Sequence, residues 1–176
     1  MEDNYFGFYG ISPAFFPDEK MIKQKYYEYS KLYHPDFYTG ENEKKQTEVL
    51  ALSSLNNKAY TTLSNKNKRI AYIISLFYPA DESMEKIMDT DFLMEMMDWN
   101  EKLAEAQMEN DENALAAFSK DCDQMITEME NSIRPDLETF DKGQRDKALL
   151  DRIRDYYFKK KYLLRVQENI SNFARL

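Results

Sequence analysis

The stretch Lys-Leu-Tyr-His-Pro-Asp-Phe-Tyr-Thr-Gly, residues 31–40, decides how the first part of this chain folds. Pro35 cannot continue a helix interior and biases His34 away from the helical region, so a helix should end here. His34 is the only histidine among the 176 residues. With the Asp36 carboxylate, these residues predict an exposed turn that caps a helix and projects into solvent. Such a turn is suited to contacting a partner, although an ordinary turn is the alternative from the three residues alone.

Helical patterns on both sides of this turn predict a hairpin of two antiparallel helices. The first helix covers residues 18–33, follows Pro17 and has acidic residues in its first turn. A helix advances about 100° per residue, which places four side chains on one stripe: Ile22, Tyr26, Tyr29 and Tyr33. The opposite side of the helix carries Lys20, Lys23, Tyr27 and Lys31.

The other segments of this first part also read as helical. A short turn is predicted over residues 5–10, and Ser64-Asn65 should cap a helix over residues 66–77. The second helix of the hairpin covers residues 42–63. Its core side is expected at Val49, Leu52, Leu55 or Asn56, Ala59 and Leu63.

A helical stretch meets a proline at residues 77–81, and the chain is predicted to divide there. We expect one domain over residues 1–77, a linker over 78–83 and a second domain over 84–176. Three longer helices are predicted in the second domain, at about 84–109, 112–133 and 144–173, with turns at 110–111 and 134–143. Pro135 either kinks a helix or ends it. Short connections favour an antiparallel three-helix bundle, so the predicted fold class is all-α.

Composition limits the kind of protein this is. Hydrophobic residues make up 43% and charged residues 32%, as in a folded soluble protein. No apolar run approaches the length of a membrane span, and the acidic N-terminus does not read as a secretory signal. The single cysteine, Cys122, excludes an internal disulfide and offers no zinc or cluster framework. We therefore expect a cytoplasmic protein with no membrane partner.

The net charge of −8 is unevenly distributed along the chain. Residues 1–77 carry ten Lys/Arg and nine Asp/Glu, whereas residues 78–176 carry fourteen and twenty-three. An acidic second part argues against nucleic acid and anionic lipid as its ligands. The split indicates two units that face different partners.

No enzyme chemistry emerges from the residues. The chain has no Gly-rich phosphate loop, no nucleophile elbow and no second histidine for a metal site or a catalytic triad. Runs of carboxylates such as Asp121 with Asp123 read as solvated helix faces rather than metal ligands. We expect no catalytic residue, no metal and no cofactor.

The first helix of the second domain has more apolar residues than a buried strip needs. Its core-facing strip recurs at spacings of three and four: Phe92, Met96, Trp99, Leu103 and Ala106. The surplus lies on its sides, interleaved with acids: Leu93, Met94, Met97 and Met108, with Asp98, Glu101 and Glu105. On the last helix, Phe158 points away from the predicted buried stripe. An acidic-rimmed apolar patch is typical of an interaction site, while burial against other helices is the alternative.

At this point the sequence resembles a known family. Tyr5-Phe6, the lysine-bearing helix into Tyr33-His34-Pro35-Asp36, and Asn56-Asn57-Lys58-Ala59-Tyr60 resemble a J-domain. Residues 69–76, the segment Asp89-Thr90-Asp91-Phe92-Leu93-Met94-Glu95 and Tyr157-Phe158 look like the HscB family, the J-type co-chaperones of iron–sulfur cluster assembly. The resemblance covers nearly the whole chain.

The resemblance implies two binding surfaces and no enzyme activity of the protein's own. His34, Pro35 and Asp36 match the triad through which J-domains stimulate ATP hydrolysis by a chaperone of the HscA or DnaK type. Lys23 and Lys31 lie on the helix face that docks on that chaperone, and Lys20 and Tyr27 share this face. The residues that match the patch binding an IscU-type scaffold protein are Leu93, Met94, Met97, Asp98, Glu101, Glu105 and Phe158.

Two other readings stay open. One is a J-domain protein that serves a different client or acts as a general holdase, which predicts appreciable binding to unfolded polypeptides. A purely structural helical module, in which the triad is incidental, predicts no effect on any ATPase.

Overall fold

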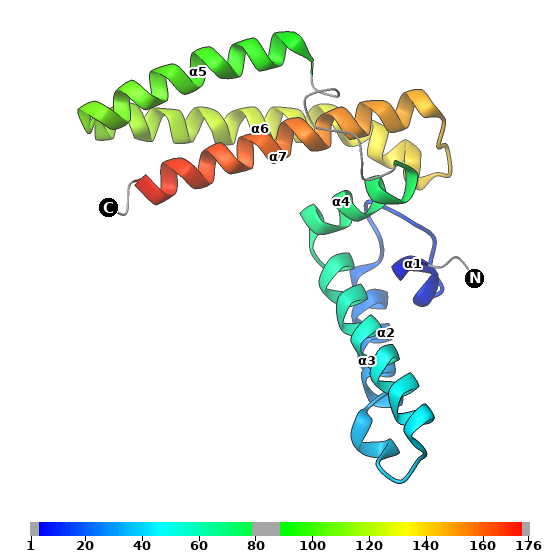
Figure 1. Cartoon of the computed structure of the whole chain (residues 1–176). Helices are drawn as coiled ribbons and strands as arrows, with labels where there is room; N and C mark the ends of the chain where they lie inside the picture. The colour runs from blue at the N-terminus through cyan, green and yellow to red at the C-terminus, as the bar shows by residue number, and fades with distance from the viewer. Residues whose placement is uncertain (1–3, 79–88, 174–176) are drawn as a thin grey trace. The chain divides into compact units, whose positions relative to one another are not determined.

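The computed structural model describes residues 4–78 and 89–173, and over these ranges its regular structure is helical with no strand (Figure 1). The chain divides into two compact units, Met1–Phe77 and Tyr78–Leu176. The helices of the first unit are α1 (Tyr5–Phe8), α2 (Glu19–Leu32), the short 3-10 helix η1 (Pro35–Tyr38), α3 (Glu43–Leu63) and α4 (Lys66–Phe77). The predicted all-α fold class is confirmed. Most of the predicted linker, and residues 84–88 of the following predicted helix, lie outside the described residues.

Side-chain caps set where the hairpin helices begin. The Asp18 carboxylate accepts from the backbone N–H groups of Lys20 and Met21, at 2.9 and 3.2 Å, so α2 begins at Glu19. The Asn42 side chain accepts from the Lys45 N–H at 2.9 Å and begins α3 in the same way. Such caps satisfy N–H groups that have no partner within the helix. Both helices lie within one residue of their predicted bounds.

A buried asparagine joins α1, α2 and α3. The prediction left the core position open between Leu55 and Asn56, and the structure buries Asn56 while Leu55 is only half-buried. The Asn56 amide accepts from the Tyr9 hydroxyl at 2.9 Å and donates to the Tyr26 carbonyl and the Ser30 hydroxyl, both at 3.0 Å. A buried polar group is tolerated when its hydrogen bonds are made, and here they tie three helices together.

Replacing Asn56 with alanine is expected to lower the free energy of unfolding of the first unit. The variant would lose the side-chain bonds to the Tyr9 hydroxyl, the Tyr26 carbonyl and the Ser30 hydroxyl, while the Tyr9 hydroxyl keeps the Asn56 carbonyl at 3.2 Å. Losing buried hydrogen bonds of this kind costs about 1–3 kcal/mol in all. Urea unfolding followed by circular dichroism measures the change. Asn57→Ala is the matched control, since this exposed neighbour makes only a 3.2 Å bond with the Tyr26 hydroxyl and should cost about 0.5 kcal/mol. Equal losses for the two variants would contradict the role of Asn56.

The second unit is a bundle of three long helices that lie side by side (Figure 1). They are α5 (Thr90–Glu109), α6 (Glu112–Asp141) and α7 (Lys147–Phe173). The predicted strip on α5 is confirmed as its inner side, with Trp99 only half-buried. The predicted stripe on α7 is also buried: Leu149, Ile153, Tyr156, Leu163 and Ile170. Among the described residues, none of the helices is both long and apolar enough to cross a bilayer.

The structure corrects one predicted boundary. A helix end at residue 133 and a turn over 134–143 were predicted, but α6 continues from Glu112 to Asp141 with Pro135 inside it. A proline in a helix interior costs about 3 kcal/mol, because its N–H is missing and its ring crowds the preceding turn. The continuation is favoured by the apolar residues that it buries: Ile133, Leu137 and Phe140. The Thr139 hydroxyl also donates to the Pro135 carbonyl at 2.8 Å. The turn comes later, with Gly143 at a φ of 97°.

Cys122 is buried inside this bundle. Its side chain is fully buried between α6 and α7, and the thiol donates to the Leu163 carbonyl at 3.4 Å. Burial raises the pKa of the Cys122 thiol to about 11, and the nearby Asp123 carboxylate adds to the effect. The thiol is therefore protonated at neutral pH and shielded from reagents.

Two outcomes follow for Cys122. Ellman's reagent at pH 8 should react with the native protein far more slowly than with protein unfolded in guanidinium. The unfolded state loses the thiol proton at lower pH than the folded state, so this group's contribution to stability is lost as the pH rises toward about 11. Fast labelling of the native protein would contradict the buried position.

Candidate functional site

The triad forms an exposed, ordered turn at the end of the hairpin. His34 is the N-cap of η1, with an extended backbone at φ −72° and ψ 121°, and Pro35 is the first residue of that turn. The His34 Nδ1 atom accepts from the Asp36 N–H at 3.3 Å and lies 3.8 Å from the Asp36 carboxylate. The two side chains are 51% and 83% exposed. The predicted turn and its projection into solvent are confirmed. The preceding helix α2 is capped by Tyr33, and His34 caps the short η1 that follows it.

Hydrogen bonds from outside the triad hold this turn in place. The Tyr38 hydroxyl donates to the Leu32 carbonyl at 2.8 Å, which ties η1 back to the end of α2. The Gln46 amide on α3 donates to the carbonyls of Thr39 and Glu41, at 3.3 and 2.8 Å. The loop is therefore anchored to both helices of the hairpin, so a partner meets a shape that is already formed.

The α2 face next to the triad presents the predicted residues to solvent. The exposed side chains on this face are Lys20, Lys23, Tyr27 and Lys31, whereas Ile22 on the opposite stripe is buried. From Lys20 to Lys31 the helix rises about 16 Å, at about 1.5 Å per residue. The basic face therefore runs the length of α2 and ends beside His34.

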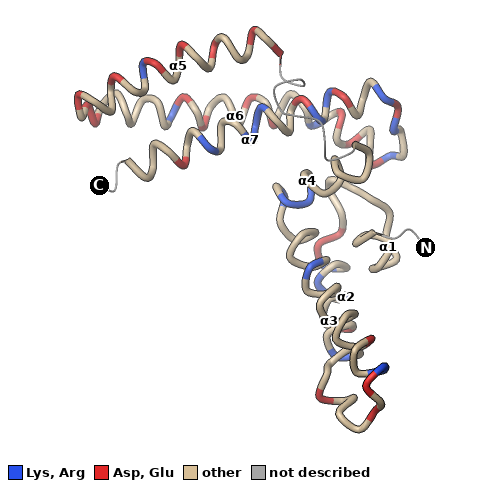
Figure 2. Tube along the Cα trace, in the orientation of Figure 1, with Lys and Arg blue, Asp and Glu red and all other residues tan. Residues whose placement is uncertain are grey.

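The apolar surplus on α5 lies on the surface. Met94 is 61% exposed and Met97 is 71% exposed, while Leu93 is half-buried. Asp98, Glu101 and Glu105 are exposed beside them. Figure 2 shows acidic positions recurring along α5 with a single basic one, Lys102. Burial of the two methionines against other helices, the alternative considered from the sequence, is therefore wrong.

Phe158 lies on α7, at a place where this helix touches α5. Its half-buried ring packs against Tyr157, with centroids 5.0 Å apart. The next residue, Lys159, places its ammonium 5.4 Å from the centroid of the Phe92 ring on α5. Leu93 therefore follows Phe92 in the sequence and Phe158 precedes Lys159, the two residues that form this contact between α5 and α7. We call the seven residues Leu93, Met94, Met97, Asp98, Glu101, Glu105 and Phe158 the α5–α7 patch.

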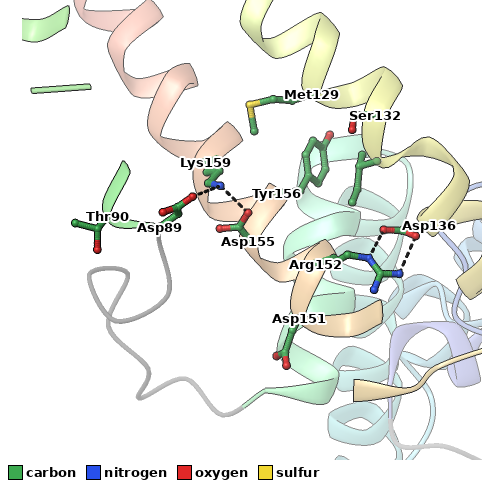
Figure 3. Close-up of a pocket in the computed structure, with 11 residues that line it drawn as sticks. Asp89, Thr90, Met129, Ser132, Asp136, Asp151, Arg152, Asp155, Tyr156 and Lys159 are labelled. Carbon is green, nitrogen blue, oxygen red and sulfur yellow. Dashed lines mark hydrogen bonds and ion pairs between the residues drawn. The ribbon is translucent and has the colours of Figure 1, made fainter. Parts of the chain in front are cut away.

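A cleft of about 810 Å³ opens between the start of α5 and helices α6 and α7. Most of its charged groups pair with one another (Figure 3): Arg152 with Asp136 at 2.7 Å, and Lys159 with Asp155 at 2.9 Å and Asp89 at 3.9 Å. Asp151 pairs instead with Arg154, at 3.2 Å. Asp89 is also the N-cap of α5. The Lys159–Asp89 pair connects the start of α5 with α7, and the Arg152–Asp136 pair connects α6 with α7, so these charges stabilise the contacts between the helices. The sequence did not predict the Arg152–Asp136 and Lys159–Asp89 pairs, because each joins residues of different helices, whereas Lys159 and Asp155 are one helical turn apart on α7.

No metal centre is formed among the described residues, since no three His, Cys, Asp or Glu side chains come close enough to hold an ion there. The described surfaces present an imidazole beside a carboxylate, a lysine face, and an apolar patch with an acidic rim.

Comparison with known proteins assigns both units. Residues 4–72 match the DnaJ domain, and residues 88–171 match the HSCB C-terminal oligomerisation domain. The co-chaperone protein HscB of Proteus mirabilis is 33% identical over 126 residues, which cover 70% of this chain and 73% of that protein. The HscB homolog of Neisseria meningitidis is 30% identical over 86% of this chain and 95% of its own length.

Solved structures show the same fold. Chaperone HscB from Vibrio cholerae superposes with a TM-score of 0.72 at 22% identity, covering 98% of both chains. Human co-chaperone protein HscB gives 0.75 at 24% identity, covering 97% of this chain and 81% of that one. These relatives are J-domain co-chaperones and not enzymes, in agreement with the sequence-based expectation. The chain belongs to the HscB family of J-domain co-chaperones.

Proposed function

We propose that this protein delivers an IscU-type scaffold protein to an HscA- or DnaK-type chaperone and stimulates ATP hydrolysis by that chaperone, in support of iron–sulfur cluster assembly. The observation that carries the proposal is the presence of two exposed recognition surfaces on separate units. One is the anchored turn with His34, Pro35 and Asp36; the other is the α5–α7 patch. The protein then acts as an adaptor, and the hydrolysis takes place on its partner.

The charges support a division of labour between the units. The lysines of α2 suit an acidic surface on the chaperone, while the acidic rim of the α5–α7 patch suits a basic border on the scaffold. Complementary charges steer each partner to its own unit and disfavour the exchanged arrangement. Rim charges of this kind mainly change association rates and salt dependence.

Because the two surfaces are joined in one chain, the encounter between a bound scaffold and the chaperone becomes intramolecular. A scaffold held on the second unit meets the chaperone at an effective concentration set by the connection between the units, without any new contact. Hydrolysis triggered by the triad then closes the chaperone on a client that is already present.

The test is the steady-state ATPase of the chaperone from the same organism, with and without this protein and the scaffold. Stimulation that needs both proteins and exceeds the product of their separate effects supports the adaptor. Stimulation that is indifferent to the scaffold keeps the co-chaperone role but assigns another client. In that case, binding to unfolded polypeptides tests for a holdase.

A further inference from the structure

Phe37, the residue after the triad, is an exposed aromatic side chain with no part in the protein's core. Its ring is 69% exposed, and the neighbouring Leu32 at the end of α2 is about half exposed. A large apolar side chain left in water at the tip of a hairpin does not stabilise the hairpin itself. Clusters of such side chains on a soluble protein mark places where a partner binds.

The turn holds this ring beside the imidazole. The Phe37 N–H donates to the His34 carbonyl at 3.1 Å, and the two rings have centroids 5.5 Å apart at 50°. The bond from the Tyr38 hydroxyl to the Leu32 carbonyl brings η1 and the end of α2 together. Leu32 and Phe37 therefore border the triad within one anchored turn. A partner that contacts the triad also meets these apolar groups.

We propose that Phe37, bordered by Leu32, is an apolar contact for the DnaK-type chaperone and supplies the part of its affinity that salt does not remove. The inference rests on the proposed function and names the chemistry of the partner: an apolar depression beside acidic groups. We expect acidic groups on the chaperone at this place because the lysine face of α2 reaches Lys31, three residues before His34. Because Phe37 directly follows the triad, the apolar depression on the chaperone should lie next to the chaperone groups that contact the triad.

Salt separates the two kinds of contact. Attraction between exposed charges is screened over about 10 Å at 0.1 M salt and about 3 Å at 1 M, whereas burial of a phenyl ring is not weakened in this way. Affinity for the ATP-bound chaperone is measured by biolayer interferometry at 50 mM and 500 mM potassium chloride. Phe37→Ala should weaken binding on the order of tenfold at both concentrations. Lys23→Ala should weaken binding at 50 mM and have little effect at 500 mM.

Matched variants exclude a loss of fold and a general effect of apolar side chains. Phe37→Leu should restore most of the affinity, because it keeps an apolar group on the turn. Met21 is 44% exposed on α2, and about 16 Å of helix separates it from Leu32. Met21→Ala should therefore leave the affinity unchanged. The melting temperature of Phe37→Ala should equal that of the wild type.

Three results would overturn the inference. One is equal salt sensitivity of the Phe37→Ala and Lys23→Ala defects. Another is complete loss of wild-type binding at 500 mM salt, which would mean that charge alone holds the complex. A third is a lower maximal ATPase rate with unchanged affinity, which would make Phe37 a positioning residue for His34. If the wild type itself fails to stimulate the chaperone, the proposed function fails instead.

Discussion

Asp36→Asn is expected to abolish stimulation of the chaperone's ATPase while leaving the J-domain folded. The carboxylate is 83% exposed and lies 3.8 Å from the His34 Nδ1 atom, so the isosteric amide removes charge without disturbing packing. At an interface, removing one partner of a desolvated charge pair costs about 2–5 kcal/mol. That loss corresponds to a fall in affinity of about 30-fold or more.

The measurement is the ATPase rate of the chaperone over a range of concentrations of each variant, with and without the scaffold. Glu41→Gln is the matched control, since it removes an exposed carboxylate a few residues further along the same loop. The two variants should have the same melting temperature and differ only in stimulation. Full stimulation by Asp36→Asn would remove the triad from the mechanism.

Leu93→Ala combined with Phe158→Ala is expected to abolish binding of the scaffold and to spare stimulation of the chaperone without scaffold. Leu93 is on α5 and Phe158 is on α7, so the double variant removes apolar side chains from both helices of the α5–α7 patch. Central apolar anchors contribute about 2 kcal/mol or more each on truncation. The combined loss is then on the order of 100-fold or more in affinity.

Isothermal titration of the scaffold into each variant measures this loss. Met108→Ala is the control on the same helix, because Met108 is also exposed but lies about 22 Å of helix beyond Leu93. Since Leu93 and Phe158 are half-buried, Met97→Asp is added as a variant that changes only an exposed side chain and should weaken binding too. Unchanged scaffold affinity in both the double variant and Met97→Asp would rule out the α5–α7 patch.

Local chemistry made much of the fold predictable. Aspartate and asparagine are favoured at helix N-caps. Asp18, Asn42 and Asp89 each cap a helix here. Helical phase placed Met94 and Met97 off the buried strip of α5, and both are exposed. The triad was recognisable because a proline in that context forces the turn that displays it.

What could not be predicted depends on contacts between distant residues. The course of α6 through Pro135 follows from burial against other helices, which outweighs the local penalty. Lys160 is buried on α7 and pairs with Glu130 on α6 at 2.6 Å. Its spacing falls on the buried stripe, four residues after Tyr156, but a lysine is ordinarily expected on the surface. Phe37 was passed over because a single aromatic residue in a loop has no periodicity to reveal whether it is buried.

The sealed position of Cys122 has a consequence for a protein that handles cluster chemistry. Thiolates are the usual ligands of iron–sulfur clusters, and the only thiol in this chain is buried and protonated at neutral pH. A carrier with reactive thiols on its surface would compete with the scaffold for the iron that the scaffold holds. Because its one thiol is buried and protonated, this co-chaperone offers no cysteine ligand that would compete for the iron of a cluster.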